Sequence, residues 1–180
     1  MRVDRRVFLL TVASAAACSW KRERSPLTRA AQYLWAQQAA DGGFHSATYG
    51  LLRSGQSLTP LVLGALLRVP DATVPDTAGS VDRAIAFIRR HTTVDGAVGV
   101  IGGDADYPNY ATALAVDALV AAQRRSWTAD IAPMVAQLRA QQFSEANGWT
   151  PEHPAYGGWG MGGAIRRPPD ARIARARPRK

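Results

Sequence analysis

The fold of this chain is decided by the stretch AQYLWAQQAADGGF, residues 31–44, a helical pattern that stops at two glycines and an aromatic residue. Its apolar and aromatic side chains recur at steps of three and four residues, the spacing of one face of an α-helix. Gly42 and Gly43 end the pattern, because glycine adopts the left-handed conformation that closes a helix without steric cost. The stretch therefore predicts a helix over 28–40 with one buried stripe.

Two weaker copies of this pattern follow, one over 83–98 and one over 134–149. Their helix-ending glycines are Gly96 and Gly148, so that the three glycines stand 54 and then 52 residues apart. A near-constant period of this length is typical of a chain built from repeated supersecondary units. We therefore expect each copy to be one repeat of the same fold.

A second and more apolar helix is predicted within each of the first two repeats. One covers 58–67 and is capped by Ser57 or Thr59, and the other runs over 107–123. Placing Thr59 under Thr112 aligns the leucines and alanines of the two segments. Because both segments are apolar nearly all round, they should lie inside the fold, with the amphipathic helices outside them.

The remaining helices complete a two-layer arrangement. Ser80 is the expected cap of a third helix that ends near Arg90, and a fifth helix starts near Asp130 and ends before Asn147. No sixth helix is predicted. The expected fold is all-α, with about two and a half helical hairpins over residues 27–164.

The positive charge of the chain is confined to its two ends. The whole sequence carries +8, of which residues 1–25 hold +4 and residues 165–180 hold +6, which leaves the middle of the chain at −2. Nucleic-acid binding by the folded part is excluded, because phosphate recognition needs a clustered positive face. Residues 165–180, rich in Arg, Ala and Pro, are predicted to form a disordered basic tail.

The first residues have the order of parts of an export signal. Arg5 and Arg6 precede an apolar run over 7–17 that is too short to span a bilayer, an order that resembles a twin-arginine leader with Asp4 in place of the usual Ser or Thr. Small residues then precede Cys18 as in a bacterial lipobox. The interpretation that follows is a signal over 1–18, lipidation of Cys18 and a polar tether over 19–26; the alternative is a buried, inert cysteine.

The repeats resemble the prenyltransferase and squalene-oxidase repeat family, which includes squalene–hopene cyclases, oxidosqualene cyclases and protein prenyltransferase β subunits. The resemblance spans about residues 27–168 and also includes the segment GGWG at 157–160. The residues assigned to the repeat motif are Gln37, Gln38, Gly42, Gly43, Phe44, Gln141, Gln142, Gly148 and Trp149.

The resemblance implies an (α/α) toroid, of which this chain holds an incomplete ring, as a truncated or frame-shifted member would. It implies a hydrophobic or isoprenoid ligand. Two function classes are left open. The favoured one is a non-catalytic binding or scaffold module, exported and anchored by lipid to the membrane surface as a periplasmic or cell-surface lipoprotein of a bacterium. The other is an isoprenoid cyclase- or prenyltransferase-like enzyme.

Three aspartates are candidates for a catalytic acid. Asp104 and Asp106 are a partial match to the Asp-x-Asp-Asp motif with which terpene cyclases of this family protonate a double bond, but the last acid is missing. The favoured interpretation of this pair is a capping loop ahead of the 107–123 helix. Asp117 stands in that otherwise apolar helix, where a carboxylate that is buried and perturbed or that lines a cavity would be a site candidate. The favoured alternative is a partly exposed or paired aspartate.

No cofactor or metal site is predicted. The three histidines are scattered without ligand spacing and Cys18 lies outside the repeats, which argues against zinc. The segment 158–163 fits G-x-G-x-x-G but lacks the strand and helix that a phosphate-binding loop requires, so we expect an ordinary loop there.

Overall fold

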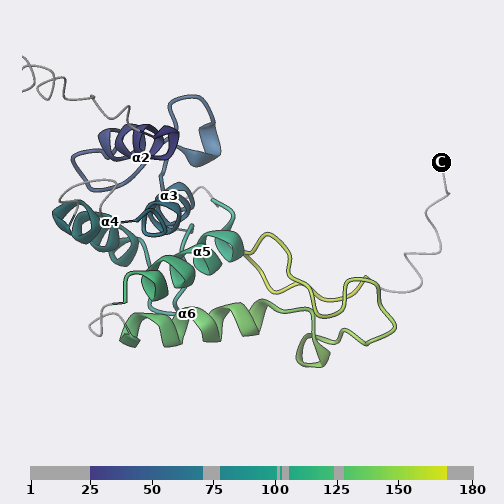
Figure 1. Ribbon diagram of the computed structural model, residues 1–180. Helices are drawn as coiled ribbons and strands as arrows, with labels where there is room; N and C mark the ends of the chain where they lie inside the picture. Colours follow the sequence, from purple (N-terminus) through teal and green to yellow (C-terminus); the bar gives the residue numbers. More distant parts are fainter. Residues whose placement is uncertain (1–24, 71–77, 101, 103–105, 124–127, 170–180) are drawn as a thin grey trace, which may run out of the picture.

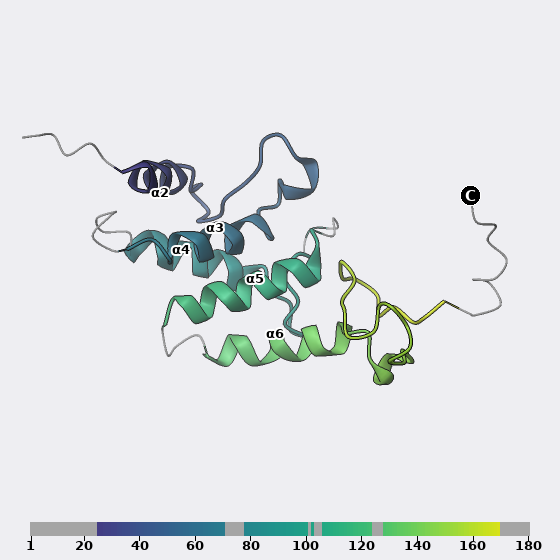
Figure 2. The ribbon, with the colours of Figure 1, turned by 45° about the vertical axis from the view of Figure 1, so that its right-hand side comes forward.

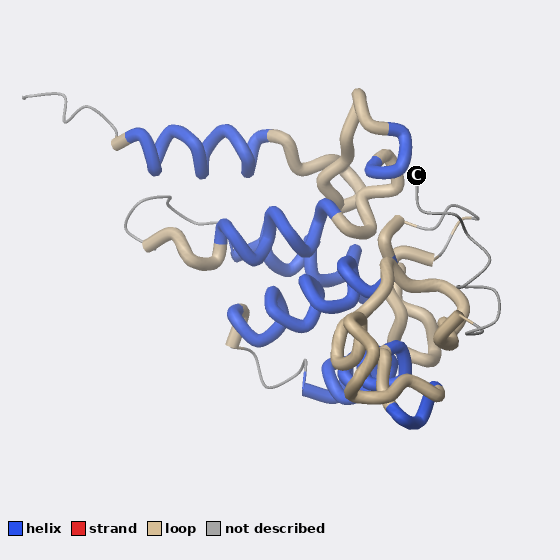
Figure 3. Tube along the Cα trace, turned by 90° about the vertical axis from the view of Figure 1, so that its right-hand side faces the viewer, coloured by secondary structure: helices blue, strands red, loops and turns tan. Residues whose placement is uncertain are grey.

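A computed structural model describes residues 25–70, 78–100, 102, 106–123 and 128–169 of the protein. Over these ranges the chain forms five α-helices and two short 3-10 helices, and it contains no β-strand (Figures 1 and 3), which confirms the predicted all-α class. The elements in order are α2 (Pro26–Ala36), η1 (Gly50–Leu52), α3 (Leu58–Leu66), α4 (Ala78–Arg90), α5 (Pro108–Ala121), α6 (Thr128–Gln141) and η4 (Glu145–Asn147).

The starts of α2 and α4 differ from the predicted ones. Helix α2 begins two residues early, because Ser25 Oγ accepts a hydrogen bond from the N–H of Thr28 at 3.1 Å and Pro26 occupies the first turn. Helix α4 begins at Ala78, so Ser80 lies within its first turn and is not the cap that we predicted.

Helices α3 and α5 form the inner layer of the protein. Their mutual contact is the most extensive between any two described helices, with α4 packed on α3 and α6 packed on α5 (Figures 1 and 2). Helix α2 lies at the opposite end of this stack from α6 in both views. The core between the layers is built from Ala31, Phe44, Leu63, Leu66, Val81, Ala84, Ile85, Ile88, Val98, Ala111, Ala115, Ala118, Leu119 and Met134.

The inner helices approach each other closely because one of them carries a glycine at the contact. A Cβ added to Gly64 of α3 would lie 3.3 Å from Asp117 Oδ2 and 3.9 Å from Ala118 Cβ of α5. The facing side of α5 is made of small side chains, including the fully buried Ala111 and Ala115. Small residues on both sides allow tight packing of two helices that are apolar over most of their surface.

The loops that follow α2, α4 and α6 gather at one end of the helices (Figure 3). The longest loop region described, residues 142–169, extends beyond the end of α6 (Figures 1 and 2).

The first five residues of the predicted tail, 165–169, are largely exposed and belong to no helix, and 170–180 lie outside the described residues. The predicted export signal, Cys18 and most of the tether also lie outside them. None of the described helices has the length and apolarity needed to cross a bilayer.

Candidate functional site

The first two glycine turns share one hydrogen-bond pattern. In each turn, the backbone N–H of the first residue donates to the C=O of the residue after the glycine. The N–H of the glycine donates to the C=O of that same first residue. The donor–acceptor pairs are Ala39–Gly43 and Gly42–Ala39 in the first turn and Thr93–Ala97 and Gly96–Thr93 in the second, all at 2.9 Å. The predicted repeat is therefore present at the level of individual backbone groups.

The third turn with this pattern is formed by Gly157 and Gly158. Phe143 N–H donates to Gly158 C=O at 2.9 Å, and Gly157 N–H donates to Phe143 C=O at 2.8 Å. Gly157 has a φ of 79°, close to the 88° of Gly42 and the 85° of Gly96. The structure thus corrects the register of the third repeat, which we had placed at Gly148.

The bridges beside the turns give the same register. Thr92 pairs with Val98 in an isolated antiparallel bridge, and Gln142 pairs with Trp159 in another. Phe44, Val98 and Trp159 consequently hold the same place in successive repeats. The spacing from Gly96 to Gly157 is 61 residues rather than 52, because the third turn carries an insertion between Phe143 and Gly157.

The glutamines of the motif hold the turns to the helix ends. Gln38 Nε2 donates to Gly42 C=O at 3.0 Å and to Ser80 C=O of α4 at 2.8 Å. Gln142 Nε2 makes the matching bond to Gly157 C=O at 2.9 Å. Gln141 Nε2 instead donates to Gly163 C=O at 2.9 Å, and Gln37 is exposed.

The first two turn glycines pack directly against the next outer helix. A Cβ on Gly42 would lie 2.5 Å from the carbonyl oxygen of Arg83 in α4, and one on Gly96 would lie 2.5 Å from that of Pro133 in α6. Gly148 has only Pro168 Cδ nearby, at 3.8 Å. The glycine turns are therefore contacts between repeats, and Gly148 is not one of them.

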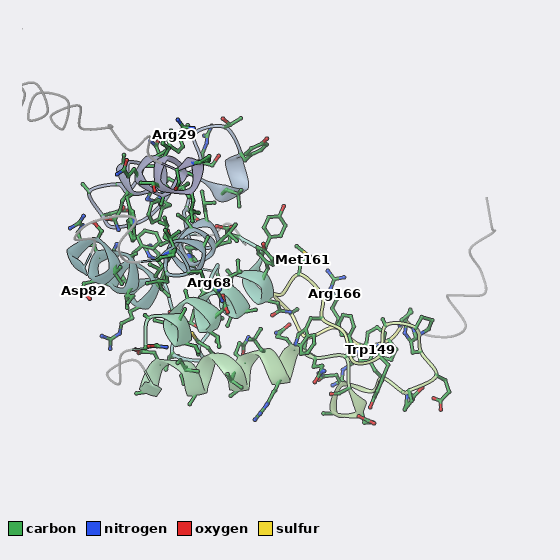
Figure 4. All side chains as sticks on the ribbon, viewed as in Figure 1. Arg29, Arg68, Asp82, Trp149, Met161 and Arg166 are labelled. Atoms are coloured by element: carbon green, nitrogen blue, oxygen red, sulfur yellow. The ribbon has the colours of Figure 1, made fainter. Side chains whose placement is uncertain are left out.

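Gly148 and Trp149 belong to the inserted loop. The Trp149 ring is stacked on Phe143 with 4.4 Å between centroids, and His153 contacts it edge-on at 4.6 Å. Trp149 Nε1 donates to Arg166 C=O at 2.9 Å, and Figure 4 shows Trp149 within the loop region that extends beyond the end of α6. These contacts give the loop a small core of its own.

Two threonines of the inner helices bind the turns. Thr59 Oγ1 accepts from the backbone N–H of Phe44, and Thr112 Oγ1 accepts from that of Val98, each at 2.9 Å. Both threonines are fully buried. The alignment of Thr59 with Thr112 came from the sequence, but their role as acceptors for the turn did not.

Asp106 is fully buried and serves the start of helix α3. Its Oδ1 accepts from Ser57 Oγ at 2.6 Å, and its Oδ2 accepts from Ser54 Oγ at 2.8 Å and from the N–H of Ser57 at 3.1 Å. The sequence predicted a cap for the following helix, α5, and this is wrong, because α5 begins after Tyr107 without a side-chain cap. Asp106 instead binds the residues at the start of α3. Asp104 lies outside the described residues.

Asp117 is half-exposed and paired. Arg68, two residues after the end of α3, donates from Nη2 to both of its carboxylate oxygens, at 2.7 and 2.9 Å, and Figure 4 labels Arg68 at the meeting of the two inner helices. Of the two alternatives that the sequence left open for this residue, the structure has the ion pair. The two candidate acids that the structure describes, Asp106 and Asp117, thus have separate partners.

The Asp41 carboxylate contacts two partners in the first glycine turn. Its carboxylate accepts from the N–H of Gly43 at 2.9 Å and lies 3.1 Å from His45 Nε2, while His45 Nδ1 contacts Arg53 C=O at 2.8 Å. Burial raises the pKa of Asp41, but the bonds from Gly43 and His45 and the charges of His45 and Arg90 lower it, so that its pKa lies below the usual value of 3.8.

An apolar hollow lies between α5 and α6. It has a volume of about 400 Å³ and lies between the first turns of α5, the last turn of α6 and the loop after the third glycine turn. We call it the α5–α6 groove, and its lining residues are Asn109, Tyr110, Ala113, Leu138, Trp159, Gly160 and Met161. Figure 4 shows Met161 beside the start of α5.

The groove is held open by polar bonds behind its apolar lining. Asn109 N–H donates to Met161 C=O at 3.1 Å, and Asn109 Nδ2 donates to Gly160 C=O at 3.0 Å. Trp159 Nε1 donates to Leu138 C=O at 2.6 Å. None of the lining residues is acidic, basic or a histidine, and the sequence pattern had not indicated the groove.

Metal-ligating side chains do not cluster in the part of the chain that the structure describes, where no three His, Cys, Asp or Glu residues lie close enough to hold an ion. Comparison of the chain with protein-family models, with curated proteins and with solved structures gives no match. The proposals below therefore depend on the contacts described above and on the sequence resemblance.

Proposed function

We propose that this chain is a non-catalytic helical-repeat module of the prenyltransferase and squalene-oxidase repeat type, an arc of an (α/α) toroid that binds a hydrophobic ligand or partner. The observation that carries the proposal is the α5–α6 groove, an apolar hollow between α5, α6 and the loop after the third glycine turn. Exposed apolar surface rimmed by polar groups is typical of a binding site.

The candidate acids support a structural role over a catalytic one. The Asp106 carboxylate accepts its three described hydrogen bonds from Ser54 and Ser57, in the segment that leads into α3, and Asp117 is paired with Arg68. A general acid has to reach the atom that it protonates. Neither aspartate lines the groove.

The alternative function is that of an isoprenoid cyclase- or prenyltransferase-like enzyme. One observation favours it, because Tyr110 and Trp159 both line the groove and aromatic faces stabilise a developing carbocation. An enzyme of this kind would use the same groove for substrate and would need an acid that the described lining does not supply.

The two functions are separated by incubating the full chain with squalene and with prenyl diphosphates. We expect no cyclised or transferred product, and we expect radiolabelled farnesol to bind. Binding should be lost in Ala113→Arg, which fills the groove, and kept in Ala86→Arg, a matched exposed alanine on α4. Cyclised or transferred product would overturn the proposal in favour of the enzyme.

The cellular location is also a proposal. We propose an exported bacterial lipoprotein anchored through Cys18, on the strength of the signal-like order of residues 1–18. Expression of Cys18→Ser in a bacterium should move the protein from the membrane fraction to the soluble fraction and remove an acyl modification from its mass spectrum. Unchanged fractionation would contradict the anchor.

A further inference from the structure

One pair of neighbouring residues in the inserted loop, residues 144–156, has a chemistry of its own. Asn147 precedes Gly148, and the sequence holds one other asparagine, Asn109, which precedes Tyr110. The backbone nitrogen that follows an asparagine is able to attack the amide carbon of its side chain, and a glycine presents that nitrogen without a side chain to hinder the approach. Asn147 is therefore the asparagine of this chain that is chemically suited to deamidation.

The folded loop engages both groups that take part in this reaction. The Gly148 N–H, which contains the attacking nitrogen, donates to Glu145 C=O at 2.9 Å. Asn147 Nδ2, which would leave, donates to Ala140 C=O at 2.9 Å and to Gln142 C=O at 2.8 Å, and Asn147 is only 8% exposed. Because the nucleophile and the leaving group are both hydrogen-bonded elsewhere, the closed loop protects Asn147 from the reaction.

The protecting bonds belong to a segment with a small core of its own. Helix η4, which contains Asn147, makes no extensive contact with any other described helix. The loop is held mainly by Trp149, whose ring stacks on Phe143 and whose Nε1 donates to Arg166 C=O. A segment held by few side chains opens locally at a smaller free energy than the whole fold. Such an opening frees the Asn147 amide and the backbone nitrogen after it together.

We propose that Asn147 is a site of spontaneous deamidation whose reaction is controlled by local opening of the inserted loop. Hydroxide takes the proton of the Gly148 N–H, the nitrogen forms a bond to Cγ of Asn147, and the Cγ–Nδ2 bond breaks, so that ammonia leaves and a cyclic succinimide remains. Water then adds to either ring carbonyl and breaks its bond to nitrogen, which gives aspartate or isoaspartate. The net change is the gain of one water and the loss of one ammonia.

The product is unable to restore the closed loop. A carboxylate in place of the amide has no donor for the carbonyls of Ala140 and Gln142, and a buried charge that faces two carbonyl oxygens is unfavourable. Isoaspartate also adds a methylene to the main chain between Ser144 and Trp149, which are joined by a backbone bond of 3.0 Å. Since Gln142 pairs with Trp159, the damage extends to the third glycine turn, and the change is one-way.

The rate is measured on the full chain in mildly alkaline buffer, by peptide mapping with mass spectrometry and by enzymatic methylation of isoaspartate. A free peptide with the sequence of residues 143–157 gives the rate in the absence of the fold. We expect Asn147 in the protein to react at least about tenfold more slowly than in the peptide, and the protection of the Gly148 N–H from hydrogen exchange to match this factor within about threefold, since both report the same opening. Asn109 should stay unreacted over the same time.

Two tryptophan variants test whether the opening is local. Trp149→Ala removes the ring that stacks on Phe143 and should bring the rate to within about threefold of that of the peptide. Trp35→Ala is the matched control, since Trp35 is a half-buried tryptophan that packs on Phe44 in the first repeat, and it should keep the rate of the parent chain.

A further pair of variants tests the effect of the product. Asn147→Asp should speed amide hydrogen exchange over residues 157–161 by at least about tenfold. The effect should exceed that of Asn147→Ala, which loses the same two hydrogen bonds without adding a charge.

Three results would overturn the inference. The first is an equal rate in the protein and in the peptide, which would mean that the fold gives no protection. The second is a failure of Trp149→Ala to accelerate the reaction, or equal acceleration by Trp35→Ala, which would assign the reaction to global unfolding. The third is parent-like exchange in Asn147→Asp. If Trp149→Ala does not fold, the comparison of the peptide rate, the protein rate and the Gly148 exchange decides without it.

Discussion

The carboxylate of Asp106 accepts two hydrogen bonds from Ser57, one from its hydroxyl at 2.6 Å and one from its backbone N–H at 3.1 Å. The bonds join the loop of the second repeat to the first turn of α3 in the first repeat, across 49 positions of sequence. A helix start carries free N–H groups and a partial positive charge, so a carboxylate is well matched to it. The pair fixes how the two repeats stack.

Replacing Asp106 with alanine should destabilise the fold strongly. The change leaves the N–H and hydroxyl of Ser57 buried without their acceptor, and we expect the free energy of unfolding to fall by about 3 kcal/mol. Asp117→Ala is the control, since its pair with Arg68 is half-exposed and should contribute about 0.5 kcal/mol. Urea unfolding measures both, and equal losses would contradict a structural role specific to Asp106.

The two threonines that bind the glycine turns should contribute similar amounts to the free energy of unfolding. Thr59→Val and Thr112→Val keep the shape of the side chain but leave the N–H of Phe44 or Val98 unsatisfied, at a cost of about 1–2 kcal/mol each. Thr→Ser variants at the same positions retain the acceptor and lose only a methyl group. Chemical denaturation would contradict the repeat if the serine variants were less stable than the valine variants.

The corrected register predicts that alanine substitution destabilises the fold more at Gly42 than at Gly148, although the two glycines have similar backbone conformations. Gly42→Ala should cost about 3 kcal/mol or more, because it combines the left-handed φ of 88° with a clash against Arg83 C=O. Gly148→Ala, at φ 81° with nothing nearer than 3.8 Å, should cost only the conformational part, about 1–2 kcal/mol. Thermal unfolding of the two variants decides between the registers.

The stability of the first turn should depend on pH through Asp41. Its folded pKa lies below its unfolded value, so the contribution is present above the usual pKa of 3.8 and is lost as pH falls through the lower folded pKa. We expect Asp41→Asn to flatten the stability profile below about pH 4. Urea midpoints from pH 2.5 to 6 test the prediction, and a profile as steep as that of the parent chain would assign the effect to other groups.

Much of the helical layout could be predicted from the sequence, because it depends on local patterns. The stripe that runs through Leu34 and Trp35 has helical spacing, and the nearly continuous apolar run of α3 can only be satisfied inside. The period between Gly42 and Gly96 followed from the same local signal. The third repeat was misplaced because Asn147-Gly148-Trp149 imitates the turn motif within an insertion.

The groups that bind across repeats could not be predicted. Asp106 looked like a cap for the helix that follows it, since sequence alone favours the nearest partner, yet its partners are Ser54 and Ser57. The pairing of Arg68 with Asp117 joins residues 49 positions apart and depends on the side-by-side packing of α3 and α5. Such contacts depend on how the helices are placed in space, and the periodicity of apolar residues along the chain does not predict that placement.

The sequence by itself determined the all-α class and the division into apolar inner helices and amphipathic outer ones, because burial of apolar side chains imposes its period on the chain. Only the tertiary structure decided which glycines join repeats, which carboxylate is buried and where an apolar face is left open. Those properties arise when α5 packs on α3 and α6 on α5, since the apolar groove is lined by residues of α5, of α6 and of the loop that follows α6.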